Sequence, residues 1–146
     1  MTYKGRYKIK NPSKYKGNPT QVVFRSLWER QVFRWCDNED GVLQWSSEEI
    51  IIPYRCKTDN RVHRYYPDVY IKTKQGEYLI EIKPKKETNP PRNGSRKTKK
   101  YLNEVMTYIK NTSKWDAAKD YCADRGYTFQ IWTEETLTSL GIKILK

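Results

Sequence analysis

The stretch that decides the fold is HRYYPDVYIKTKQGEYLIEIKPKK, residues 63–86. It contains two runs, 65–73 and 77–83, that are rich in β-branched and aromatic residues. The turn Lys74-Gln75-Gly76 separates them, and such a pattern predicts a β-hairpin. Pro84 lacks the backbone N–H that a sheet needs, so regular pairing is expected to stop there.

The hairpin brings three charged residues together. If the turn is centred between Lys74 and Gln75, opposing residues are those whose numbers add to 149, as Asp68 and Glu81 do. Directly opposed side chains have Cβ atoms about 5 Å apart. Lys83 shares the face of Glu81, because side chains alternate along a strand. A register shifted by one residue would instead place the two carboxylates on opposite faces.

Two carboxylates this close repel each other unless a proton or a cation lies between them. A divalent cation such as Mg²⁺ prefers hard oxygen ligands and keeps several waters, one of which can act as a nucleophile. The Lys83 ammonium can orient that water and stabilise charge that develops on a phosphate. The alternative is a solvated strand pair with ordinary surface charges, since Pro-Asp and Glu-x-Lys are common short strings.

The rest of the chain predicts an α/β fold in which helices flank a mixed central sheet. Asn18-Pro19-Thr20 reads as a helix start, with Phe24, Leu27, Trp28, Val32 and Trp35 on the core face of a helix that reaches Cys36. The other expected elements are a strand at 49–55, a loop at 84–97, helix at 98–125 that Asn111-Thr112-Ser113 can break in two, a strand at 127–132, a short helix at 134–140 and a last edge at 142–145. We therefore expect a basic extended arm at 1–17 and a single domain at 18–146.

Charge is concentrated in two segments. The chain has a formal net charge of +12, yet residues 1–17 hold six basic side chains and no acid, and residues 83–100 hold eight against Glu87. This distribution favours a polyanion partner over a solubilising surface, which would intersperse Lys and Glu. The candidate DNA-contacting residues are Lys4, Arg6, Lys8, Lys85, Lys86, Arg92, Arg96, Lys97, Lys99 and Lys100.

Other chemistries have little support. Cys36, Cys56 and Cys122 lack CxxC spacing, so isolated reduced thiols are expected rather than a disulfide framework or a zinc site. His63 is the single histidine, with no motif of a nucleophile system around it. No apolar run approaches the roughly 18 residues of a membrane span, and the N-terminus lacks a signal-peptide core. A soluble protein is the expectation.

Glu29, in the sequence RSLWER, has three interpretations. It can complete a capping box with Ser26, although a helix that starts near Asn18 argues against this. It can pair with Arg25 four residues earlier. It can also be a third carboxylate, presented by a helix beside the hairpin to a second metal ion or its water.

The blocks HRYYPDVYI, YLIEIKPKK and FQIWTEE, after a Glu in an early helix, resemble the nuclease subunit of heteromeric transposases (TnsA) within the PD-(D/E)XK superfamily. A closer resemblance, covering nearly the whole chain, is to the head-completion nucleases of tailed phages, in the blocks YKGRYKIKNPSKY, RSLWER, IIIPY, HRYYPD, IEIKPK and KWDAAKDYC. The resemblance implies a restriction-endonuclease-like core and magnesium-dependent hydrolysis of DNA, with Mn²⁺ able to substitute. It also implies that Glu29, Asp68, Glu81 and Lys83 form the active site, with the Ile82 carbonyl as a further metal ligand.

The resemblance further implies action late in phage head assembly, in the bacterial host cytoplasm or on the virion, with DNA and head, portal or neck proteins as partners. Neither a membrane nor a small-molecule cofactor is expected. Two alternatives stay open: a non-catalytic DNA-binding assembly protein on the same scaffold, and a junction resolvase of the same superfamily. A pure binder has no need for a carboxylate pair that would repel DNA phosphates, so Asp68 and Glu81 favour an enzyme.

Overall fold

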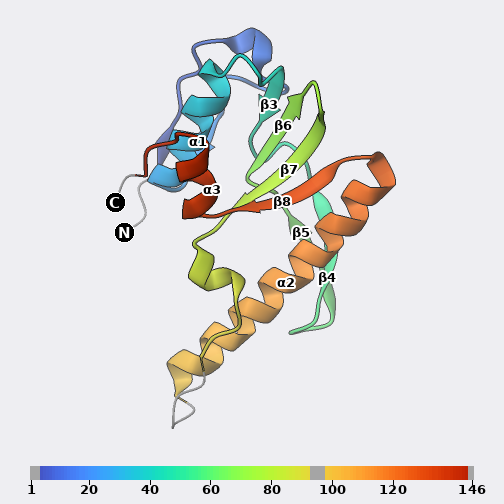
Figure 1. The fold of residues 1–146 in the computed structure, drawn as a ribbon. Coiled ribbons are helices and arrows are strands. Elements are labelled where there is room, and N and C mark those ends of the chain that lie inside the picture. Colours follow the sequence, from blue (N-terminus) through green and yellow to red (C-terminus); the bar gives the residue numbers. More distant parts are fainter. Residues whose placement is uncertain (1–3, 93–97, 145–146) are drawn as a thin grey trace.

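The computed structural model describes residues 4–92 and 98–144. Its centre is a four-stranded sheet, ordered β3 (Gln44–Ser46), β6 (Val69–Thr73), β7 (Gly76–Ile82) and β8 (Thr128–Trp132). β6 pairs antiparallel with both of its neighbours, and β7 pairs parallel with β8, so the sheet is mixed (Figure 1).

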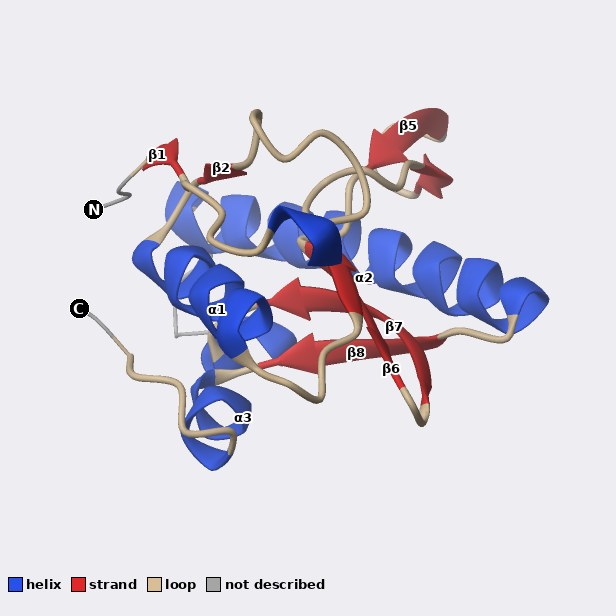
Figure 2. Ribbon diagram, turned by 90° about the horizontal axis from the view of Figure 1, so that it is seen from above, coloured by secondary structure: helices blue, strands red, loops and turns tan. Residues whose placement is uncertain are grey.

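Helices cover both faces of this sheet. α1 (Leu27–Asn38) and α3 (Glu134–Ser139) pack on the face that carries Val69, Ile71 and Ile80. α2 (Lys99–Arg125) and the hairpin of β4 (Ile52–Cys56) with β5 (Arg61–Tyr65) pack on the face that carries Tyr70 and Leu79 (Figure 2). Alternation of side chains along the strands produces these two hydrophobic clusters. The expected α/β architecture, a mixed sheet flanked by helices, is confirmed.

The register of the predicted hairpin is also confirmed. Val69 pairs with Ile80 and Thr73 with Gly76, so opposing residue numbers add to 149. One step beyond the last ladder pair, the same register sets Asp68 against Glu81. Both residues therefore belong to the face of Tyr70 and Leu79, the one covered by α2 and the β4–β5 hairpin.

The predicted start of the first helix is wrong. α1 begins at Leu27, and Ser26 is its N-cap, with the Ser26 side chain accepting a hydrogen bond from the Glu29 backbone N–H. Asn18 caps a turn instead, where its side chain accepts from the Thr20 backbone N–H. The intervening residues include β2 (Val23–Phe24), which pairs with β1 (Gly5–Arg6) and so cannot be helical.

Four further predicted segments differ from expectation. The run 65–73 is two strands, because the chain turns at the buried Pro67 between β5 and β6. The strands β3 and β5 were not predicted.

α2 continues through Asn111-Thr112-Ser113 without a break, since Asn111 and Ser113 are buried and the Ser113 hydroxyl donates to the Ile109 carbonyl. Residues 142–144 form no strand. Within the predicted loop 84–97, residues Lys85–Thr88 form a short 3-10 helix, η2, and 93–97 lie outside the described residues.

Other expectations hold. α2 ends at Gly126, whose φ of 72° is a left-handed conformation that favours glycine. Thr133 caps α3, and β8 lies within one residue of its predicted position. The three cysteines are free thiols, as predicted, and all three are buried. In the described part of the chain, no helix is long and apolar enough to cross a bilayer.

The N-terminal segment packs on the body along one side. Tyr7 and Ile9 are half-buried against the core, while Lys4, Arg6, Lys8 and Lys10 are exposed. η1 (Pro12–Lys14) follows, and Tyr15 is buried beside Trp45. Tyr7 and Tyr15 are thus packing residues, whereas Tyr3 lies outside the described residues. The division of the chain at residue 17 stays a prediction.

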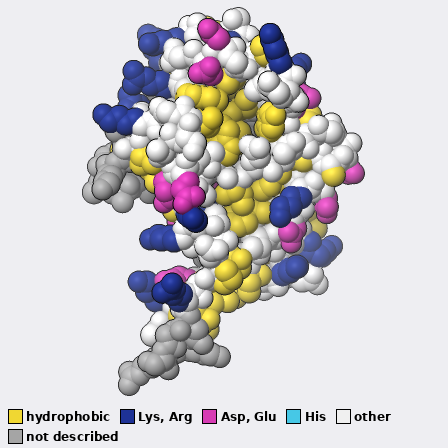
Figure 3. Space-filling model, viewed as in Figure 1, with side chains coloured by type: hydrophobic (Ala, Val, Ile, Leu, Met, Phe, Trp, Pro, Cys, Tyr) yellow, Lys and Arg dark blue, Asp and Glu magenta, His cyan; other side chains and the backbone are white. Residues whose placement is uncertain are grey.

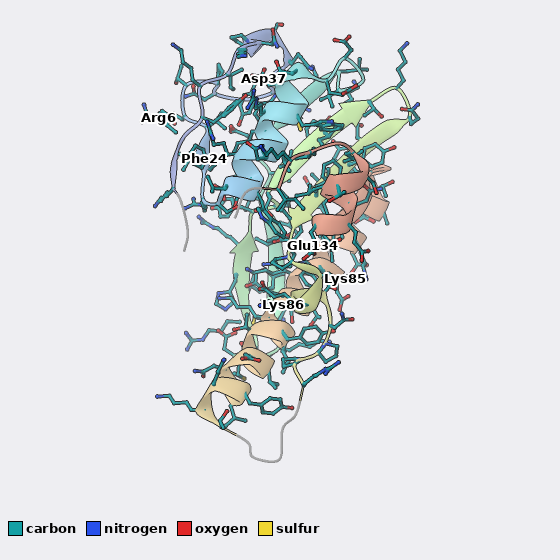
Figure 4. All side chains as sticks on the ribbon, turned by 60° about the vertical axis from the view of Figure 1, so that its left-hand side comes forward. Arg6, Phe24, Asp37, Lys85, Lys86 and Glu134 are labelled. Carbon is teal, nitrogen blue, oxygen red and sulfur yellow. The ribbon has the colours of Figure 1, made fainter. Side chains whose placement is uncertain are left out.

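Asp37 holds this segment to α1 (Figure 4). The carboxylate is fully buried and accepts hydrogen bonds from the backbone N–H groups of Lys10 (2.7 Å) and Asn11 (3.0 Å) and from the Tyr7 hydroxyl (3.1 Å). Hydrogen bonds to an ionised acceptor are stronger than neutral ones. One side chain near the end of α1 therefore anchors the N-terminal segment.

Replacing Asp37 with Ala should destabilise the protein by about 3 kcal/mol, because it leaves buried donors unsatisfied. Thermal unfolding measures the loss, and limited trypsin digestion should show faster cleavage after Lys8, Lys10 and Lys14. Asp40→Ala is the control, since Asp40 is exposed. Unchanged stability and digestion in Asp37→Ala would mean that the segment is held by its apolar contacts alone.

Candidate active site

The β6–β7 hairpin and the residues beside it hold the predicted chemical groups together. Asp68 immediately precedes β6, and its Oδ2 accepts a hydrogen bond from the Ile82 backbone N–H at 2.7 Å. Glu81, on β7, is 8% exposed. The Lys83 Nζ lies 3.4 Å from the Glu81 Oε2. The hairpin therefore places a basic group and two acids on one face at the end of the strand pair.

Tyr65, the last residue of β5, contacts the same cluster. Its buried hydroxyl donates a hydrogen bond to the Glu81 Oε1. Burial, together with the charges of Glu81 and Asp68, raises the pKa of Tyr65 well above its usual range, so the phenol stays a donor. Both oxygens of Glu81 thus have partners from this protein: Tyr65 on one and Lys83 on the other.

Glu29 reaches the region from the first turn of α1. Its backbone N–H is capped by Ser26, and its Oε2 accepts from the backbone N–H of Arg25 at 3.2 Å. The Arg25 guanidinium makes two hydrogen bonds to Glu48, at 3.0 and 3.1 Å. Ser26 therefore caps α1, but Glu29 does not complete a capping box, because its carboxylate accepts from the Arg25 N–H and not from the Ser26 N–H. The Glu29 carboxylate is left partly buried at the start of the helix.

Electrostatics indicates that three carboxylates share one site. Burial raises the pKa of Asp68 well above its usual range, and the charges of Glu81 and Glu29 raise it further. Burial also raises the pKa of Glu29, with smaller contributions from the charges of Glu48 and Glu81. Clustered pKa shifts of this kind, caused by burial and like charges, are typical of functional sites.

These residues fit a divalent cation of the magnesium type. The donors are hard carboxylate oxygens, and Mg²⁺ is usually bound by one or two carboxylates plus waters. No group of three acidic, His or Cys side chains in the described residues is already arranged around one ion position. Asp68 and Glu81 are therefore the candidate direct ligands, with Glu29 able to act through water; the Ile82 carbonyl stays a predicted ligand.

Lys114 is a residue that the sequence reasoning did not select. It lies on α2, partly buried, with its Nζ 5.6 Å from the centroid of the Tyr65 ring. Burial lowers the pKa of Lys114, and Lys110 and Lys83 add to the shift, while Glu81 and Asp68 oppose it. A signal was available: Asn111, Trp115 and Ala118 are at helical spacing around Lys114, which puts a charge on the buried face of α2.

The predicted DNA-contacting residues lie in two regions, one along the N-terminal segment and one around η2 and the start of α2, and Figure 3 shows Lys and Arg near both. Lys85 is not free: its Nζ lies 2.7 Å from Glu135, and its backbone N–H donates to Glu134 (Figure 4). Lys86, Arg92, Lys99 and Lys100 are exposed, as are Lys4, Arg6 and Lys8. Arg96 and Lys97 lie outside the described residues.

Two other polar residues have structural partners. His63 contacts Asp59 at 2.7 Å across the loop of the β4–β5 hairpin, and its ring is stacked near Tyr54. Gln44 belongs to β3, paired with Lys72 at the far end of β6. Neither contacts the carboxylate cluster through a hydrogen bond between described residues.

Comparison with known proteins agrees with this geometry. A family model described as TnsA-like endonuclease N terminal matches residues 39–134, a span from the end of α1 to the start of α3 that contains Asp68, Glu81 and Lys83. The chain belongs to the TnsA-like endonucleases. The head completion nuclease of Enterobacteria phage T4 is 42% identical to it over 148 residues, covering 98% of this chain and 99% of that protein.

Membership confirms the expected family, the restriction-endonuclease-like core and the nuclease class. Glu29 lies outside the matched residues, whereas Lys114 lies inside them. The individual roles of Glu29, Asp68, Glu81 and Lys83 remain predictions, which the geometry supports through their convergence.

In the presence of a chelator, Asp68→Asn should become more stable than the wild type as the pH rises. Below about pH 4, Asp68 is protonated in both the folded and the unfolded state. Above that, the unfolded chain releases this proton first, because the folded pKa is raised, so the wild type loses stability until the folded group also ionises. The gain at neutral pH should be on the order of 1 kcal/mol.

Thermal unfolding between pH 4 and pH 8 measures the difference, and Asp124→Asn, at an exposed position, serves as the control. An Asp68→Asn protein that is less stable than the wild type at neutral pH would contradict the argument. It would mean that the hydrogen bond from the Ile82 N–H outweighs the repulsion from Glu81.

Proposed function

We propose that the protein is a magnesium-dependent endodeoxyribonuclease that hydrolyses phosphodiester bonds at the site formed by Glu29, Asp68, Glu81 and Lys83. The observation that carries the proposal is the opposition of Asp68 and Glu81 across the β6–β7 register, with Lys83 3.4 Å from Glu81. In a protein that binds DNA, two opposed acids would repel each other and the DNA phosphates unless a cation lay between them.

Each residue has a task that follows from its position. A bound divalent cation supplies Lewis acidity and a water of lowered pKa. Asp68, held by the Ile82 N–H, and Glu81, held by Tyr65, present their oxygens in fixed directions. Lys83 carries a positive charge beside Glu81, where it can orient the attacking water and stabilise the charge of the pentacovalent phosphate. Glu29, on the α1 side, accepts a hydrogen bond from a water at the site.

DNA is the substrate that the charge distribution supports. The chain as a whole carries a net charge of +12, so the phosphate backbone is attracted to the protein although the candidate site itself is acidic. The exposed basic residues of the N-terminal segment and of the η2–α2 region are the proposed backbone contacts. They carry no base-specific information, which predicts weak sequence preference.

The biological setting is proposed from the relative. The T4 protein is a head completion nuclease, and the match spans nearly both chains. We propose the same role here: action on or near packaged DNA as a phage head is completed, in the bacterial host cytoplasm or on the particle, in contact with head, portal or neck proteins. Mn²⁺ is expected to replace Mg²⁺, because it accepts the same oxygen donors.

Glu81→Ala and Lys83→Ala should each lower plasmid nicking by roughly a hundred- to a thousandfold while leaving DNA binding largely intact, because they remove groups that act on the reacting phosphate. Glu29→Ala should lower the rate as well. Conversion of supercoiled plasmid to open circles is the measurement, with Mg²⁺, Mn²⁺, Ca²⁺ and chelator as parallel conditions. Cleavage is expected only with Mg²⁺ and Mn²⁺.

Glu104→Gln and Lys119→Gln are matched controls, since both residues are exposed on α2. Both controls should cut at the wild-type rate. A Glu81→Ala protein that nicks plasmid as fast as the wild type, or a wild type that cuts fully in chelator, would remove the basis of the proposal.

Replacing Lys4, Arg6 and Lys8 by Gln in one triple variant should flatten the salt dependence of DNA binding. Each phosphate contact contributes about 0.9 to the slope of log affinity against log salt, so up to about 2.7 should be lost. Truncation is unsuitable, because Tyr7 packs on the core. Neutralising the exposed Lys57, Lys72 and Lys74 is the charge-matched control. Equal slopes in the two triple variants would show that the N-terminal segment does not lie on DNA.

A further inference from the structure

Lys114 has an unusual environment for a lysine. It projects from a buried stretch of α2 in which Asn111, Ser113 and Trp115 face the body. Its ammonium lies over the Tyr65 ring, 5.6 Å from the centroid. Among the described residues, Lys114 makes no hydrogen bond and no ion pair within 4.0 Å. A partly buried ammonium without an anionic partner is costly unless a ligand supplies one.

The position of Tyr65 connects Lys114 to the candidate active site. The face of the Tyr65 ring supports the ammonium, and the hydroxyl of the same ring donates to Glu81. Lys83, directly after β7, lies 3.4 Å from the other oxygen of Glu81. Two lysines from different elements therefore contact the hydrogen-bonded pair of Tyr65 and Glu81: Lys114 of α2 lies over the Tyr65 ring, and Lys83 lies beside the Glu81 carboxylate.

Lys114 either serves the fold alone or binds an anionic ligand. If Lys114 served the fold alone, its charge would be offset by an anion of the protein, yet no carboxylate of the described residues lies within 4.0 Å of its Nζ. An aromatic ring attracts a cation but is not a strong hydrogen-bond acceptor, so this contact leaves the three ammonium donors without acceptors among the described residues. A phosphate oxygen of a bound polynucleotide would accept from them, and the ammonium already lies beside the cluster at which such a phosphate would be cleaved.

We infer that Lys114 is a further substrate-binding residue, which contacts a DNA phosphate at the cleavage site from the α2 side. This inference rests on the proposed nuclease function and extends it. Tyr65 holds the lysine stem in place and keeps Glu81 in position, so the phosphate is contacted by Lys83 on one side and Lys114 on the other. The site then spans β5, β7 and α2 rather than the hairpin alone.

The test compares Lys114→Met with Lys119→Met, an exposed lysine five residues later on the same helix. Methionine keeps most of the apolar stem and removes the charge. Binding of a fluorescein-labelled DNA duplex is measured in Ca²⁺, where no cleavage is expected, and plasmid nicking in Mg²⁺. Lys114→Met should bind about 10- to 100-fold more weakly, the loss typical of one charged hydrogen bond, and its salt slope should fall by about 0.9. Lys119→Met should match the wild type.

Lys114→Arg should recover most of the affinity, because guanidinium also binds phosphate. Thermal unfolding of each variant separates a folding defect from a binding defect. A folded Lys114→Met with wild-type affinity and salt slope would overturn the inference, as would a loss of stability with unchanged binding. If Lys114→Met fails in either of these ways while Glu81→Ala does not nick plasmid in Mg²⁺, the nuclease proposal stands and the proposed role of Lys114 is wrong.

Discussion

The antiparallel pairing of β6 with β7 is the interaction on which the rest of the structure depends. Its register sets two acids against each other at the end of the strand pair, an arrangement that by itself destabilises the fold. The cost is offset by burial of the same strands on both faces: Val69 and Ile80 pack beneath α1 and α3, and Tyr70 and Leu79 pack beneath α2. A strand slipped by one residue would move these apolar side chains to the opposite face, where they would not fit the existing packing, so the hydrophobic layers hold the carboxylates in opposition.

Three polar contacts hold the two carboxylates that the strand register brings together. The Ile82 backbone N–H binds Asp68, the Tyr65 hydroxyl binds Glu81, and Lys83 stands beside the second oxygen of Glu81. Each of these groups favours an ionised carboxylate or fixes its direction, although burial raises the pKa of Asp68. The cluster is therefore prepared for a cation, at some expense in the stability of the metal-free protein. Such exchanges between stability and activity are common at functional sites.

Outside the carboxylate cluster, positive charge predominates. The exposed Lys4, Arg6 and Lys8 extend along a segment that Asp37 anchors to α1, so these charges are held at a defined place on the surface. Exposed positive charge attracts a polyanion, and in the proposed function the carboxylates bind the metal. Lys114 and Lys83 bring positive charge into the centre itself, close to where a backbone phosphate would sit.

Several features were determined by the sequence alone, because they depend on local geometry. The two-residue period of a strand puts Glu81 and Lys83 on one face, and the short turn at Lys74-Gln75-Gly76 admits the observed register. Family-specific blocks indicated the nuclease class. Tertiary structure decided the rest. Asn18 and Ser26 are both good caps, and pairing of Val23–Phe24 with Gly5–Arg6 selected Ser26. Tyr65 contacts Glu81, and Lys114 contacts Tyr65, because a distant hairpin and a long helix pack on the same sheet face as Glu81. Contacts between elements so far apart along the chain follow from packing, which no local pattern specifies.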